Sequence, residues 1–204
     1  MVLQVLIYLN DMKHNLFLIL FFLSFYNCVA QVNDTAAARL NNYRDKVFTV
    51  FNKCRLQDEE ITKAIKAKKV SDIESGRTAL LQCSMEGMKE LGTIENFDGD
   101  PALKFNCRDV LKFYQQLTES DIPQVRDFFI LEENFLKKKK EFEMKPVRKH
   151  SQAEIYAYNN EIKTYNTAIT HYTQLGNFIT GSRKLTLYNW NAYLKIFMDT
   201  HSSH

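Results

Sequence analysis

Residues 151–198 read SQAEIYAYNNEIKTYNTAITHYTQLGNFITGSRKLTLYNWNAYLKIFM, and this stretch decides the fold. One set of its positions recurs at alternating spacings of three and four residues, the period of one face of an α-helix. Ser151, with Glu154 three residues later, forms a capping box, which marks the start of a helix. We therefore expect one helix about 70 Å long, bent at Gly176 or Gly181 if at all, with this face buried against other helices. The positions are Ile155, Tyr158, Ile162, Tyr165, Ile169, Tyr172, Gly176, Ile179, Arg183, Thr186, Trp190, Tyr193 and Phe197.

Three further segments show the same helical period and predict the helices against which this face packs. A first helix is expected from about residue 33 into the lysine-rich stretch that ends at Lys69, and a second helix over residues 73–91. After a loop at residues 92–99, Asp100 and Pro101 form an N-cap followed by proline, which predicts the start of a third helix. The apolar positions are Leu40, Tyr43, Val47, Val50 and Cys54, then Ile73, Leu80, Met88 and Leu91, then Leu103, Cys107, Val110, Tyr114 and Leu117.

The third helix has two alternative ends. Its apolar period continues past Pro123 to Phe128 and Phe142, which favours one kinked helix. A proline inside a helix costs about 3 kcal/mol, however, and Asp121 is placed to cap a new helix instead. The sequence leaves both alternatives open.

Four helices with short connections predict an all-α, up-down-up-down four-helix bundle with unequal helix lengths and a long C-terminal helix. The second helix is short and the last two are long, so a helical hairpin around Phe128 to Tyr165 is expected to protrude from the bundle. The full sequence has 6 Gly and 3 Pro, too few turn residues for an all-β fold.

The N-terminal residues have the three-part form of a secretory signal. A charged start at Met12 leads into the apolar residues 16–23, and Cys28-Val29-Ala30 places small residues at the cleavage positions. We expect residues 1–30 to be a signal peptide, with 1–11 an upstream start extension, and residues 31–204 to form a single helical-bundle domain. The apolar run supplies about half of the 20 residues that a membrane span needs. The alternatives are an uncleaved anchor from Met1 and lipidation of Cys28 after cleavage before it.

The motifs of common catalytic and metal sites are missing from the sequence. It has no Glu-x-x-His pair, haem or zinc spacing, glycine-rich phosphate loop or Gly-x-Ser-x-Gly elbow. Asp98 and Asp100 are interpreted as turn and cap, His150 with Glu154 as a helix start, and His201 with His204 as a frayed tail. We therefore expect no catalytic, cofactor-binding or metal-binding residue, and a protein that is not an enzyme. The net charge of +3 is too small to indicate nucleic-acid binding.

Three cysteines remain after signal removal, namely Cys54, Cys83 and Cys107. Residues level with each other on two antiparallel helices have numbers that add to a constant. A turn centred near residue 96 places Cys83 level with Cys107, and one near residue 70 places Cys54 within about a turn of Cys83. Because exported cysteines tend to pair, we predict a Cys83–Cys107 disulfide with Cys54 free; three buried thiols packed as small apolar groups are the alternative.

Two surface features are open to interpretation. The run of lysines at 137–140 has acidic neighbours at 132, 133, 141 and 143, which favours a solvated helix face with near-neighbour ion pairs. A contact with anionic lipid or polysaccharide is the alternative. The tyrosines of the long helix, such as Tyr158 and Tyr165, are interpreted as core residues with their hydroxyls at the edge, or else as the lining of an apolar cleft.

Three segments resemble a family of exported helical-bundle surface proteins of unknown function, first noted in leptospires and common in Bacteroidetes. They are Phe97-Asp98-Gly99-Asp100-Pro101-Ala102-Leu103 with Leu111-Lys112-Phe113-Tyr114, then Asn159, Tyr165 and Asn166, and finally Trp190 to His201, similar to the family's terminal Trp, Phe and His pattern. Here Ser202 follows His201 where the family pattern has proline. The resemblance implies an exported four-helix bundle and supplies no catalytic residue.

These observations predict an exported, non-enzymatic protein of the periplasm, cell surface or extracellular medium, with an interaction or structural role. Its expected partner is an unknown envelope or surface protein, with no cofactor and no nucleic acid. Membrane attachment is expected only through a lipid or an uncleaved anchor. The alternative function is a binder of apolar small molecules or lipids that uses an aromatic cleft between helices.

Overall fold

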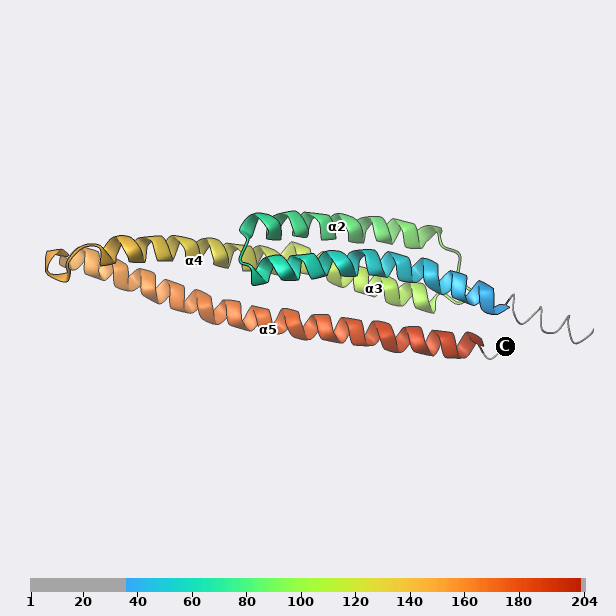
Figure 1. The fold of residues 1–204 in the computed structure, drawn as a ribbon. Coiled ribbons are helices and arrows are strands. Elements are labelled where there is room, and N and C mark those ends of the chain that lie inside the picture. Colours follow the sequence, from blue (N-terminus) through green and yellow to red (C-terminus); the bar gives the residue numbers. More distant parts are fainter. Residues whose placement is uncertain (1–35, 203–204) are drawn as a thin grey trace, which may run out of the picture.

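The computed structural model describes residues 36–202, which form helices and turns without a β-strand (Figure 1). The first helix covers residues 36–66 of the described chain and is followed by α2 (Val70–Thr93), α3 (Ala102–Gln116), α4 (Ile122–Glu143) and α5 (Gln152–Ser202). A π-helical turn, Leu117–Asp121, joins α3 to α4, and a 3-10 turn, Val147–Lys149, precedes α5. The predicted all-α, up-down-up-down arrangement is confirmed. Within this part of the chain, no helix has both the length and the apolar character needed to cross a membrane.

The molecule consists of a bundle body and a projecting hairpin (Figure 1). The first helix, α2, α3 and the C-terminal half of α5 lie along one another and form the body. Beyond the turn between the first helix and α2, only α4 and the N-terminal half of α5 continue, and they form an antiparallel hairpin. The hairpin exists because α5 has 51 residues whereas α2 has 24. The protruding hairpin predicted from the unequal helix lengths is thus present.

The α3 helix, the π-helical turn and α4 form one continuous helical rod, which we call the third rod. This rod passes Pro123 without breaking. Ile122 donates its backbone N–H to the carbonyl of Leu117, five residues back, so the helix holds one extra residue per turn here. The same pattern would send the N–H of residue 123 to the carbonyl of Thr118, but proline has none. Arg77 Nη1 on α2 donates to that carbonyl instead, at 3.4 Å. The proline is accommodated by a π-turn and a neighbouring arginine, and the choice left open by the sequence resolves to one continuous rod.

The core of the body is apolar and aromatic, and it contains one buried ion pair. Trp190 on α5 stacks on Phe51 of the first helix with ring centroids 4.4 Å apart. One level further along the same interface, Arg183 Nε donates to both carboxylate oxygens of Asp58 at 3.0 Å. The side chains of Arg183 and Asp58 are only 17% and 12% exposed. Arg183, predicted on the buried face of α5, therefore lies there with a partner.

The buried face of α5 drifts along its length. Tyr193, expected on this face, is 56% exposed, and Leu194 packs against the core in its place. An α-helix has 3.6 residues per turn, so a seven-residue repeat rotates by about 20° per heptad. The three heptads that separate Tyr172 from Tyr193 are enough to turn the latter outward.

Candidate functional site

The hairpin is held together by a ladder of stacked aromatic rings. Three phenylalanines recur every seven residues on α4, and three tyrosines recur every seven residues on α5. Phe128, Phe135 and Phe142 stack on Tyr172, Tyr165 and Tyr158, respectively, with centroids 4.2, 4.1 and 4.0 Å apart and planes 9–14° from parallel. Offset-stacked pairs of this kind stabilise by about 0.5–1.5 kcal/mol each beyond the area they bury.

Two ion pairs run alongside the ring ladder at the same seven-residue interval. Lys138 Nζ lies 2.5 Å from Glu161 Oε1, and Lys145 Nζ lies 2.7 Å from Glu154 Oε1. The residue numbers add to 300 in each of the three ladder pairs and to 299 in both of these ion pairs. This constant fixes one register for the hairpin, with the turn centred near residue 150. Sequence reasoning found both heptad series but did not align them, because alignment requires the exact turn centre.

The end of the hairpin is closed by side chains of the turn. Ser151 and Glu154 form the predicted capping box: the Ser151 N–H donates to Glu154 Oε2 at 2.7 Å, and the Glu154 N–H donates to Ser151 Oγ at 3.3 Å. The Lys145 ammonium, followed by the Ser151 backbone N–H, lowers the pKa of Glu154 to about 2. The His150 ring stacks on Phe142 at 3.9 Å. His150 and Glu154 thus act as turn and cap residues, as the sequence suggested.

Beyond the middle ring pair, Phe135 with Tyr165, the hairpin exposes basic and apolar side chains together. We call this set, comprising Lys137, Lys140, Met144, Arg148, Lys149 and Tyr156, the tip surface; all six residues are exposed. Met144 is 77% and Tyr156 70% exposed, among the highest values of the exposed large apolar residues in the described chain. The numbers of Met144 and Tyr156 add to 300, so the two lie level with each other on opposite helices. Within the lysine run at 137–140, Lys138 and Lys139 pair with Glu161 and Glu143, whereas Lys137 and Lys140 belong to the tip surface.

A shallow groove of about 380 Å³ lies between α4 and α5 on one side of the ladder. Its lining combines the edges of two stacked rings with polar and charged groups: Asp127, Ile130, Leu131, Asn134, Phe135, Lys138, Glu161, Thr164 and Tyr165. The tyrosines of α5 that suggested an apolar cleft, Tyr158 and Tyr165, are stacked on phenylalanines. The groove therefore lies beside a packed ladder on the surface of the hairpin.

His201 has a structural role at the end of α5. His201 lies within α5, where its Nε2 is 3.0 Å from Asp100 Oδ2 and its ring packs on Phe197. The expectation of a frayed tail is therefore wrong for His201, because the loop before α3 folds onto the end of α5; His204 lies outside the described residues. Asp100 also accepts the Ala102 N–H at 2.8 Å, as expected of a cap. Residues 36–202 contain no group of three His, Cys, Asp or Glu arranged to hold a metal ion.

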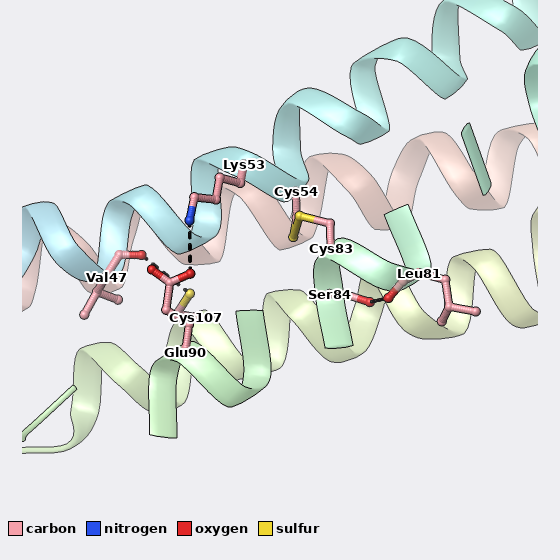
Figure 2. The surroundings of a disulfide bond; sticks show 8 residues. All are labelled: Val47, Lys53, Cys54, Leu81, Cys83, Ser84, Glu90 and Cys107. Atoms are coloured by element: carbon pink, nitrogen blue, oxygen red, sulfur yellow. Dashed lines mark hydrogen bonds and ion pairs between the residues drawn. A yellow bond between two sulfur atoms is a disulfide. The ribbon is translucent and has the colours of Figure 1, made fainter. Parts of the chain in front are cut away.

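The predicted disulfide is wrong. Cys83 bonds to Cys54, with Cα atoms 5.6 Å apart, and Cys107 is the free, buried cysteine. Figure 2 shows the bond between the first helix and α2, with Cys107 separate from it near Val47 and Glu90. Burial raises the pKa of the Cys107 thiol to about 12, which makes it unreactive. Cys28, the predicted lipidation alternative, lies outside the described residues.

The pairing follows from the positions of two turns. The first helix ends at residue 66 and α2 begins at Val70, so residues whose numbers add to about 137 lie level, and 54 with 83 satisfies this. The connection between α2 and α3 ends later than the sequence suggested, because α3 begins at Ala102. Gly87 accordingly faces Leu111, which places Cys107 level with Leu91. Cys107 therefore lies about two helical turns from Cys83.

The hairpin presents an exposed surface of basic and apolar side chains. The largest pKa shifts in the body are increases caused by burial, at Tyr43, Cys107 and Tyr114, and all three residues belong to the packed core. Compared with known proteins, the chain matches no family model, and it is not significantly similar to any curated protein or solved structure. The tip surface and the groove of the hairpin are therefore the candidate functional site.

Proposed function

We propose that this protein is an exported, non-enzymatic interaction protein of the cell envelope, which holds its α4/α5 hairpin away from the bundle body to contact a partner. The observation that carries the proposal is the hairpin itself, which extends past the other helices and has its own ladder of rings and ion pairs. A projection stabilised internally keeps a fixed shape without the body, so its surface stays available for contact. The sequence resemblance to exported helical-bundle surface proteins agrees with this role.

Two features support export. One is the three-part signal at residues 12–30, which lies outside the described residues. The other is the Cys54–Cys83 disulfide, because structural disulfides persist mainly in oxidising compartments such as the periplasm or the extracellular medium.

Removal of the hairpin tests the proposal. Deleting residues 135–165 and joining Asn134 to Asn166 through a Gly-Asn turn keeps the hairpin register, because these numbers also add to 300. We expect the shortened protein to keep its helical circular dichroism and its disulfide while losing capture of the partner that the full chain retrieves from envelope extracts.

A matched control changes exposed apolar residues of the body. Phe178→Ser with Tyr188→Ser alters two exposed positions on the body part of α5 and should leave capture unchanged. Retention of the partner by a folded, hairpin-deleted protein contradicts the proposed function.

A further inference from the structure

Positive charge is concentrated on the outer part of the hairpin. Residues 137–163 contain eight Lys or Arg and four Glu, a formal charge of +4, whereas the whole chain carries +3. The remaining residues therefore sum to a slightly negative charge. Because two of the hairpin's acids pair with Lys138 and Lys145, the exposed charge of the tip surface is dominated by Lys137, Lys140, Arg148 and Lys149.

Apolar groups accompany these charges at one level of the hairpin. Lys137, Lys140 and Met144 are spaced by three and four residues and share one face of α4. Tyr156 lies level with Met144 on α5, and both side chains are more than two-thirds exposed. Met144 and Tyr156 thus flank the hairpin six residues before and after the turn centre, while Arg148 and Lys149 occupy the turn itself.

We infer that the tip surface docks end-on to an anionic lipid surface, a partner class that rests on the proposed function of the hairpin. Basic side chains are attracted to anionic headgroups. An apolar residue and a tyrosine at equal depth suit the boundary between headgroups and acyl chains, where amphipathic rings are favoured. A polyanionic polysaccharide would satisfy the basic residues but would leave Met144 and Tyr156 without an apolar environment.

End-on docking also explains the position of the hairpin in the molecule. Lys68, in the turn between the first helix and α2, pairs with Glu132 of α4. From Glu132 to Glu143 the hairpin extends about 17 Å at the α-helical rise. This length places the body clear of a docked surface. The described helices do not span a membrane, so the contact is peripheral.

The first test measures co-sedimentation of the mature, oxidised protein with vesicles. We expect binding to vesicles of phosphatidylcholine mixed with phosphatidylglycerol, no binding to phosphatidylcholine alone, and weaker binding at high salt. Each basic residue near the surface contributes about fivefold to affinity. The tip variant with Lys137→Gln, Lys140→Gln, Arg148→Gln and Lys149→Gln should bind at least about 100-fold more weakly.

A matched body variant removes the same charge elsewhere. Lys46→Gln, Lys66→Gln, Lys89→Gln and Lys184→Gln change four exposed lysines of the body and should bind within about fivefold of the unmodified protein. Equal binding by the tip variant and the unmodified protein, or no binding to anionic vesicles, overturns the inference. The proposed function fails separately, through retained partner capture after hairpin deletion.

A second readout reports the depth of the tip. Tyr156→Trp introduces an indole at the tip, and Tyr188→Trp introduces one at a body position of nearly equal exposure, 71%. With anionic vesicles containing brominated acyl chains, the emission of the Tyr156→Trp variant should be quenched and that of the Tyr188→Trp variant should not. Absence of quenching at position 156, with dextran sulfate bound as tightly as the vesicles, would assign the tip surface to polyanions and overturn the lipid inference.

Discussion

At the scale of single residues, Pro123 shows how a local defect is tolerated inside a long helix. A proline leaves one carbonyl of the preceding turn without a backbone donor, and the residue that holds this carbonyl, Thr118, is fully buried. Arg77 donates to the carbonyl and also pairs with Glu74, which in turn pairs with Arg126. The arginine on α2 therefore compensates for the proline on the third rod.

This compensation gives the first prediction. Arg77→Leu should lower the free energy of unfolding by about 1–3 kcal/mol, because the Thr118 carbonyl loses its donor in the core. In a Pro123→Ala background residue 123 regains an N–H, so the loss caused by Arg77→Leu should shrink. Urea unfolding of the four proteins in this double-mutant cycle measures the difference.

Arg126→Leu is the matched control, because it removes an ion pair of Glu74 without changing a donor to Thr118. Its effect should be within about 1 kcal/mol, the upper end of the range for ion pairs near the surface. Additive effects of the Arg77 and Pro123 substitutions would contradict the assigned hydrogen bond.

The buried Asp58–Arg183 pair predicts a pH-dependent stability. Burial raises the pKa of Asp58, and the adjacent Arg183 opposes this shift. When the pKa of a carboxyl is higher in the folded state, its protonated form stabilises the folded state. This stabilisation is complete below the unfolded pKa of about 3.9 and is lost as the pH rises through the folded-state pKa. Arg183→Leu should cost about 3–5 kcal/mol near neutral pH, because it leaves a buried carboxylate without its partner, and progressively less as acidification protonates Asp58.

Urea unfolding at several pH values tests this dependence. Asp58→Leu combined with Arg183→Met is the control, since replacing both charges with apolar groups of similar size is often neutral or stabilising. A loss from Arg183→Leu that stays constant between neutral and acidic pH would rule out an uncompensated carboxylate as its cause.

At the scale of elements, the ring ladder predicts that the hairpin unfolds independently of the body. Phe135→Ala removes the middle ring of the ladder and should destabilise the hairpin by about 3 kcal/mol or more, with Phe135→Leu less harmful because it loses mainly the stacking. Hydrogen exchange should rise in α4 beyond Glu132 and in the facing part of α5, while amides of α2 and α3 keep their protection. Phe178→Leu, at a residue that is 56% exposed, is the control. Equal loss of protection in α2 would show that hairpin and body unfold together.

The sequence predicted the helices themselves better than the pairing between them. Helical period, the capping box at Ser151 and the unequal lengths together indicated a bundle with a protruding hairpin, because each depends on residues close in sequence. Pairing between elements depends on turn centres, where a shift of two residues changes which side chains are level. The Cys83–Cys107 prediction failed for this reason, and the Phe135–Tyr165 stacking was not foreseen. The π-turn before Pro123 also required knowledge of Arg77, which is distant in sequence.

At the scale of the whole molecule, the bundle body and the hairpin are stabilised by different interactions. Cys54–Cys83 links the first helix to α2, so it constrains the body. Residues 122–202 contain no cysteine, so the hairpin is held by stacked rings, ion pairs and hydrogen bonds instead of a disulfide. A disulfide-linked body with a separately stabilised projection agrees with the exported contact protein that we propose.

The cysteines and the signal together predict the mature protein itself. After expression of the full chain in a Gram-negative host, intact mass should show a soluble protein that begins at Gln31 and takes up one alkylating group after unfolding, at Cys107.

Peptide mapping should recover Cys54 linked to Cys83, whose sequence separation of 29 residues gives a stabilisation of about 3–4 kcal/mol in the chain-entropy account. Reduction should lower the unfolding free energy by that amount, with Cys107→Ser as the control that leaves the bond intact. Three reactive thiols, or a Cys83–Cys107 peptide, would contradict the assigned pairing. A membrane-bound mass beginning at acylated Cys28 would replace signal cleavage before Gln31 by lipidation, and would place the body at a membrane through its N-terminal end.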